Sequence, residues 1–378
     1  MRQNIKSKHI DILEICHGRI IPAYSSAYAL RVRRYLKRFQ FKKIISVGGL
    51  IFRDRKEQDS VQFRSLWMTL IAFLKGDRSL EILLSKGQLL RKKYLIEAEK
   101  IMKEATVVIF EGPWQYNLFK NSLNQKVVVY DAHNLEAYLR KNNKWENYTF
   151  KLENDLSKRA DLIITVSKND ADLFEHVYNI NREKITYIPE GFDVPRKKWY
   201  GINTNDIVFI GSAYLPNIEA AREILSMAEK LPEFTFKIIG SVCSSLRKRG
   251  IPKNVKLLGV IDEIKKEEEM CNSFLALNPV TSGSGRNLKM NDYISHGIPV
   301  ITTEVGTRGF EFELREHFII SSLENFPEEI NNMRKSPNLL GDISSYFLEY
   351  SNNNTYDITE KKAYEAITSV IHKRHFED

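Results

Sequence analysis

Short apolar runs rich in β-branched residues alternate with longer amphipathic stretches through the first half of the chain. Apolar spacings near i, i+3 and i+4, as in residues 25–39 and 79–105, predict helices for these longer stretches. The runs that we interpret as strands are residues 9–15, 42–49, 105–111, 126–133 and 161–167. Strands interleaved with helices imply parallel βαβ units whose sheet is covered on both faces.

A polar connector at residues 197–206 ends this first series, and a second series of alternating runs follows it. The simplest interpretation is an α/β fold with two Rossmann-like domains, each built on a doubly wound parallel sheet. We expect an N-terminal domain over residues 1–190 and a C-terminal domain over residues 191–357. A helix over about residues 358–378 is expected to pack back on the N-terminal domain.

Composition agrees with this fold class. The chain has 378 residues, more than one hydrophobic core usually holds, and 43% hydrophobic with 28% charged residues indicates a soluble globular protein. Three widely spaced cysteines, Cys16, Cys243 and Cys271, fit neither a disulfide framework nor a zinc site, which favours a reducing cytoplasm. The sequence has neither a signal peptide nor an apolar stretch of about 18 residues, so we expect a cytoplasmic protein.

Positive charge is concentrated in the first half. Residues 1–200 hold 37 Lys and Arg against 23 Asp and Glu, including the run "RVRRYLKRFQFKK" from Arg31. Such a surface suits anionic lipid headgroups, nucleic acid or phosphorylated substrates, and a solvated helix face is the plain alternative. Nucleic acid is the least favoured partner, because aromatic residues do not interleave with the basic ones in a binding pattern.

The loops after the strands of the second half are where an α/β sheet binds ligands. Gly211 and Ser212 follow an apolar strand directly, and a glycine there lets a phosphate approach the backbone. A Gly-Ser pair after a strand is more often only a turn, so this signal alone is weak.

The segment "GSGRNLKMNDYISHG" carries a stronger signal. Gly283 and Gly285 supply a flexible loop, Arg286 and Lys289 supply positive charge, and helical periodicity begins near Asn287. The N-terminus of such a helix favours an anion. Asp292 lies within the helix, where a carboxylate can bind two ribose hydroxyls. A mobile loop before a surface helix is the structural alternative.

His133 stands just after a predicted strand in "VVVYDAHNLE". A histidine at a strand terminus can donate to a sugar hydroxyl or relay a proton. A histidine satisfied by neighbouring backbone is an equal alternative, and Asp131 can simply cap the next segment.

The order of these segments resembles the family-4-like, group 1 glycosyltransferases of the GT-B architecture, from "DAHNLE" to "GSGRNLKMNDYISHGIPVITTEVGTRGF". The resemblance implies two Rossmann-like domains and a nucleoside diphosphate sugar as co-substrate, with no cofactor. It implies that residues 284–287, including Ser284, line the sugar and phosphate pocket, that Lys289 neutralises the diphosphate and that Asp292 binds ribose. His133 is then expected to contact the transferred sugar.

The same resemblance implies a retaining, metal-independent hexosyltransferase acting on a glycan or a lipid-linked acceptor, with possible attachment to the inner face of the membrane. Many relatives carry a pair of glutamates in the donor signature, and the matching positions here hold Ser284 and Asp292. An arginine that often serves the diphosphate is also missing from "IGSAYLPN". A catalytically inactive sugar-nucleotide-binding protein of the same fold is therefore the alternative function.

Overall fold

The computed structural model of the protein describes most of the chain, and the two parts into which it divides are treated separately. The described residues are 11–17, 31–32, 37–39, 41–48, 54–64, 80–86, 92–246, 250–282 and 287–377. Unit 1 comprises residues 1–190 and 356–378, and unit 2 comprises residues 191–355. Among the described residues, no helix combines the length and the apolar character needed to cross a membrane.

Unit 1 is built on an eight-stranded sheet with the order β3-β4-β2-β1-β5-β6-β7-β8. The strands are β1 Asp11–His17, β2 Phe41–Gly48, β3 Arg55–Lys56, β4 Ser60–Arg64, β5 Val107–Glu111, β6 Val127–Ala132, β7 Leu162–Thr165 and β8 Ile185–Tyr187. All neighbours pair in parallel except β3, which is antiparallel to β4. The sequence pattern did not predict β3, which has only two residues, or β4, whose sequence SVQFR lacks the continuous apolar run that marks a buried strand.

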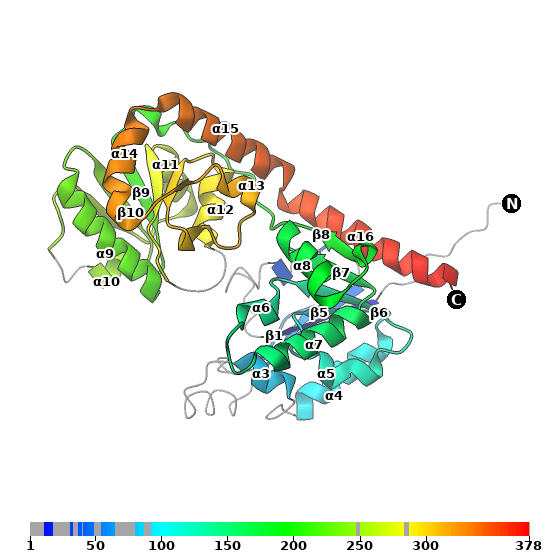
Figure 1. Ribbon diagram of the computed structural model, residues 1–378. Coiled ribbons are helices and arrows are strands. Elements are labelled where there is room, and N and C mark those ends of the chain that lie inside the picture. Colours follow the sequence, from blue (N-terminus) through cyan, green and yellow to red (C-terminus); the bar gives the residue numbers. More distant parts are fainter. Residues whose placement is uncertain are drawn as a thin grey trace. The chain divides into compact units, whose positions relative to one another are not determined.

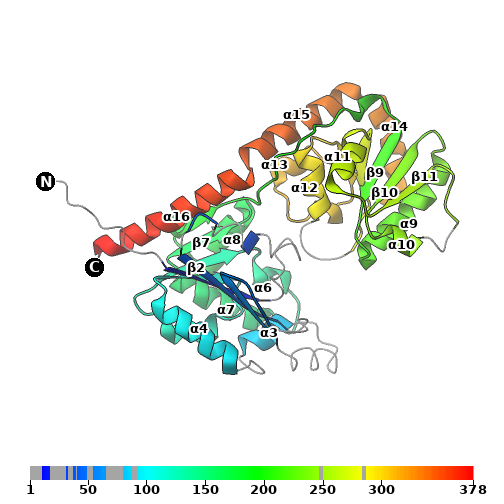
Figure 2. The same ribbon diagram turned by 180° about the vertical axis from the view of Figure 1, so that it is seen from behind.

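Helices cover both faces of this sheet (Figure 1). They are α3 Leu80–Ser85, α4 Lys92–Glu104, α5 Tyr116–Phe119, α6 Glu136–Leu139, α7 Glu146–Arg159, α8 Lys168–Tyr178 and α16 Tyr356–Glu377. Helices α4, α7 and α8 contribute to one core cluster, whereas Ala363, Ile367 and Ile371 of α16 pack on the other face with the strands. Figure 2 shows α16 on the side of the sheet opposite to α4 and α7.

The last helix is also tied to unit 1 by polar contacts. Arg374 donates to the carboxylate of Asp161 at 2.7 Å and to the backbone carbonyl of Lys126 at 2.5 Å. Helix α16 is therefore held on one face of the unit 1 sheet by both apolar and polar contacts.

Unit 2 contains a six-stranded parallel sheet with the order β11-β10-β9-β12-β13-β14. The strands are β9 Asp206–Ile210, β10 Thr235–Ile239, β11 Val255–Gly259, β12 Leu275–Asn278, β13 Val300–Thr302 and β14 Ile319–Ile320. The helices are α9 Leu215–Lys230, α10 Cys243–Leu246, α11 Glu263–Cys271, α12 Leu288–Ser295, α13 Phe312–Arg315, α14 Phe326–Arg334 and α15 Pro337–Asn353. Core clusters on both faces show that this sheet too is covered on each side.

The predicted fold class is therefore confirmed, since each unit is a parallel sheet with helices on both faces. The expected helix over residues 79–105 is described as two helices, α3 and α4. Helix α15 was not predicted. The expected helix over residues 25–39 lies largely outside the described residues.

Candidate functional site

Three carboxyl groups come together on adjacent strands at the carboxyl-end side of the unit 1 sheet. In the parallel pairing, Glu14 of β1 stands opposite Ile109 of β5, and Glu111 of β5 stands opposite Asp131 of β6. Paired residues on neighbouring strands point to the same face, and so do residues two apart on one strand. Glu111, two residues after Ile109, therefore lies on the same face of the sheet as Glu14. Both are buried, as is Asp131.

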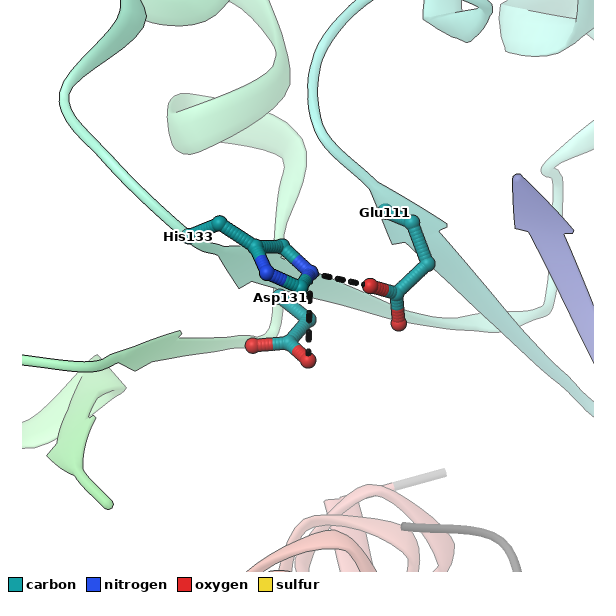
Figure 3. A group of neighbouring side chains, drawn as sticks. All are labelled: Glu111, Asp131 and His133. Carbon is teal, nitrogen blue, oxygen red and sulfur yellow. Dashed lines mark hydrogen bonds and ion pairs between the residues drawn. The ribbon is translucent and has the colours of Figure 1, made fainter. Parts of the chain in front are cut away.

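Two cationic side chains pair with these acids. Nε2 of His133 bonds to Oε2 of Glu111 and lies 3.9 Å from Oδ2 of Asp131. Figure 3 shows His133 directed at both carboxylates from the segment that follows β6. Arg31 forms a two-point contact with Asp131, Nη2 to Oδ1 at 2.8 Å and Nε to Oδ2 at 3.2 Å, and Nη1 lies 3.4 Å from Oε2 of Glu190.

The pKa values of the two glutamates are displaced in opposite directions. Burial raises the pKa of Glu14 well above its ordinary value, and the nearby Glu111 raises it further. Burial would also raise the pKa of Glu111, but the charge and hydrogen bond of His133 outweigh it and hold that pKa below its ordinary value. These directions describe a neutral Glu14 beside an ionised Glu111.

The pKa of His133 follows the same pairing. Burial opposes the charged imidazole, but the carboxylate of Glu111 outweighs burial and raises the pKa of His133 above its ordinary value. Burial raises the pKa of Asp131, with Arg31 acting in the opposite direction. His133 is therefore held as an imidazolium that donates to Glu111.

Glu111, Asp131 and His133 each offer a ligand atom within 4.8 Å of the others, a spacing that can hold a metal ion. The contacts described above already compensate these charges, because Arg31 occupies both oxygens of Asp131 and Glu111 bonds to His133. We therefore interpret the group as paired ions rather than as metal ligands.

In unit 2, Lys289 of α12 reaches β9 and the first turn of α9. Its ammonium donates to Oδ1 of Asn217 at 2.7 Å and lies 4.2 Å from the ring centroid of Phe209. The side chain is buried, and burial lowers the pKa of Lys289 to about 7. Asn217 in turn donates to the hydroxyl of Ser212 at 3.2 Å.

Gly211 and Gly240 shape the same edge of the sheet. A Cβ on Gly211 would lie 3.0 Å from the Phe209 ring and 3.2 Å from Cβ of Asn217. Gly240 has φ +107°, and a Cβ there would lie 2.3 Å from the carbonyl oxygen of Gly211. The loops after β9 and β10 therefore approach each other this closely because Gly240 carries no side chain.

Asp292 is the second predicted ligand on α12. Its side chain is 37% exposed, and Oδ2 accepts from the ammonium of Lys266 at 3.4 Å. Burial raises the pKa of Asp292, while the charge of Lys266 opposes that shift. Lys266 also contacts Glu263 at 2.6 Å, so Asp292 is part of a small ion-pair group with one face open to solvent.

The loop before α12 is described only at its two ends. The predicted ligands Gly283, Ser284, Gly285 and Arg286 lie outside the described residues. Asn287, the N-cap of α12, donates through Nδ2 to the carbonyl of Gly306 at 3.2 Å. This contact anchors the start of α12 to the segment after β13.

The structure thus brings Gly211, Ser212 and Lys289 to one edge of unit 2, joined through Asn217. Asp292 is on the same helix as Lys289. In unit 1 it adds Glu14, Glu111 and Arg31 to the predicted His133. The sequence did not predict a role for Glu14, Glu111 or Arg31, because only the folded chain places them beside His133. The same holds for Asn217 beside Lys289 and for Lys266 beside Asp292.

Two parallel-sheet units of this kind match the GT-B fold of solved glycosyltransferases, and comparisons with known families agree. Residues 77–196 match Glycosyltransferase Family 4, and residues 204–333 match Glycosyl transferases group 1. The chain belongs to the group 1 glycosyltransferases of the GT-B architecture.

The individual proteins that this chain resembles have low sequence identity to it. An uncharacterized 44.6 kDa protein in the cps region of Klebsiella pneumoniae is 23% identical over 305 residues, which cover 71% of this chain and 74% of that protein. A crystal structure of Anabaena Alr3699/HepE in complex with UDP and glucose has a TM-score of 0.65 and 15% identity, covering 96% of this chain and 100% of that one. Sucrose-phosphate synthase from Thermosynechococcus elongatus has a TM-score of 0.61 and 10% identity, with coverages of 96% and 100%. At these identities the structural likeness supports the fold.

Proposed function

We propose that the protein transfers a sugar from a nucleoside diphosphate sugar to a glycan or lipid-linked acceptor. The observation that carries this proposal is the buried amine of Lys289. Among the described residues it has an amide oxygen as hydrogen-bond partner and no carboxylate. A buried lysine without a counter-ion is unfavourable by itself, and an incoming diphosphate would supply the missing negative charge.

The leaving diphosphate gains negative charge as the glycosidic bond breaks. Lys289, Arg286 and the backbone N–H groups of the glycine loop at residues 283–285 are therefore proposed to stabilise the transition state more than the ground state. The glycines at 283 and 285 are proposed to line the same donor pocket, together with Ser284, Arg286 and Asn287. Asp292 is proposed to accept from the ribose hydroxyls.

His133 is proposed to orient the transferred sugar by donating a hydrogen bond to one of its hydroxyls. Its pairing with Glu111 keeps the imidazole charged, so it is suited to donate rather than to act as a general base. We further propose a retaining reaction without a metal ion, on the basis of the family resemblance.

The central test replaces Lys289 by Met, which keeps most of the apolar stem and removes the charge. We expect turnover to fall by on the order of a hundredfold or more, as for other groups that stabilise transition-state charge, with little change in melting temperature. Turnover should be measured with UDP-, GDP- and dTDP-linked sugars. UDP-glucose is the first donor to try, because Alr3699/HepE has been crystallised with UDP and glucose. Unchanged turnover in Lys289→Met would contradict this role.

Binding without turnover is the second candidate, and Ser284 at a position where many relatives carry a glutamate favours it. A donor that raises the melting temperature while no product forms with any acceptor would support this candidate.

We propose that the enzyme works in the cytoplasm, on the inner face of the membrane, where its basic N-terminal half meets anionic lipid. Co-sedimentation with anionic vesicles at low and high salt tests this location. Absence of binding at low salt would exclude electrostatic attachment.

A further inference from the structure

Glu14 has no role in the function proposed above, although it lies beside the group that holds His133. Its side chain is fully buried within β1. In the part of the chain that the structure describes, neither Oε1 nor Oε2 accepts a hydrogen bond. An ionised carboxylate in that position would be a buried charge without compensation. Glu14 is therefore best described as a neutral carboxylic acid, which has a proton to donate.

The acceptor for that proton is Glu111. The two side chains are buried on the same face of adjacent strands, and each acts on the pKa of the other. The charged groups that act on Glu14 are Glu111, Asp131 and Arg31. The guanidinium of Arg31 donates to both carboxylate oxygens of Asp131. The same groups face His133, whose charge also acts on the buried imidazole of His17.

We propose that Glu14 is a positioning residue: it donates its carboxyl proton to Glu111, which remains a carboxylate fixed against Nε2 of His133. The series Glu14, Glu111, His133 then holds the imidazolium in one orientation and one protonation state. The effect of Glu14 on turnover rests on the proposed function, in which His133 donates to the transferred sugar. The effect of Glu14 on the protonation of His133 is independent of the proposed function.

Kinetics provide the first test, through Glu14→Leu and Glu14→Gln. Leucine has a similar size but no proton to donate, so we expect kcat to fall on the order of tenfold with little change in KM for the donor. Glutamine still donates through its amide and is expected to stay within about threefold of the natural protein. The control is Ser46→Ala on the adjacent strand β2, because the buried hydroxyl of Ser46 has no hydrogen-bond partner among the described residues.

The second test needs no substrate. NMR of histidine-labelled protein near neutral pH should show His133 with both ring nitrogens protonated in the natural chain and in Glu14→Gln. In Glu14→Leu the signals should move toward those of a neutral imidazole, since Glu111 loses the donor that stabilises its charge. Unchanged signals in Glu14→Leu, or an equal loss in Glu14→Gln, would overturn the proposal. If the signals follow the expected pattern while no donor supports turnover, the proposed function fails and the positioning role stands.

Discussion

At the scale of single residues, the unit 1 site depends on a carboxyl group kept neutral inside a sheet. Glu14 binds a proton in the folded state that an unfolded glutamate, with a pKa of about 4.3, has released at neutral pH. The folded state then holds more protons than the unfolded state, so its stability decreases as pH rises above this value. Burying Glu14 thus lowers the free energy of unfolding at neutral pH.

Glu14→Gln should remove that penalty. We expect the free energy of unfolding of the natural protein to fall relative to the variant by about 1.4 kcal/mol for each pH unit above the unfolded pKa, up to the folded one. Chemical denaturation at several pH values from about 4 to 7 measures the difference. A difference that does not change with pH would contradict a raised pKa for Glu14.

Burial shifts the pKa of Lys289 downward, whereas it shifts the pKa of Glu14 upward. Burial lowers the pKa of Lys289 to about 7, whereas a bound diphosphate favours the charged ammonium. Donor binding above this pH should therefore take up a proton, and affinity should weaken as pH rises, by up to about tenfold per unit. Calorimetry at about pH 8 in buffers of different ionisation enthalpy detects the uptake. Lys289→Met should show none, and a buffer-independent heat in the natural protein would refute the coupling.

Sequence reading located only part of this chemistry. His133 and Lys289 stand in segments whose glycines, charges and strand ends are visible along the chain. Glu14 and Glu111 are 97 positions apart in the numbering and meet only through the register of β1 and β5. The one available signal was an acidic residue inside the otherwise apolar run "DILEIC", which a pattern search treats as an exception.

At the scale of elements, the loop after β10 depends on Gly240, where any side chain would introduce strain. Gly240→Ala would place a Cβ 2.3 Å from the carbonyl oxygen of Gly211 and force a non-glycine residue to φ +107°. We expect a loss of roughly 2 kcal/mol or more in stability, together with weaker donor binding. Thermal unfolding and donor titration measure the two effects.

Gly341→Ala is the matched control. Gly341 lies within α15, and an added Cβ there meets nothing within 4 Å. Alanine should stabilise the helix by about 0.5–1 kcal/mol. If both variants changed stability equally, the close approach of the two loops would not be the cause.

The central strands were predictable because buried β-branched runs have few alternative structures. Expected residues 105–111 contain β5, and expected residues 126–133 contain β6. The two-residue strands β3 and β14 are too short to produce a pattern. Helix α15 contains Gly, Ser and Asn, which are poor helix formers, and it is stabilised by packing of Leu340, Ile343 and Phe347.

At the scale of the whole molecule, the two units have different dependence on chain continuity. Unit 2 is a single segment, residues 191–355, whereas unit 1 needs residues from both ends of the chain. We expect residues 191–355 to fold alone and residues 1–190 to aggregate, because the latter lack the helix that covers Ile12, Ile109 and Val129. Expression of each segment with circular dichroism and gel filtration tests this. A soluble, cooperatively folded 1–190 fragment would show that α16 is dispensable.

The position of α16 also affects the order of events during synthesis. Residues 191–355 are translated before residues 356–377, which form α16. Domains usually fold in the order in which they emerge. Here one face of the unit 1 sheet stays uncovered until α16 has been made, so unit 2 is the first of the two units whose residues are all present, and a nascent chain stalled before α16 would present that uncovered face to chaperones.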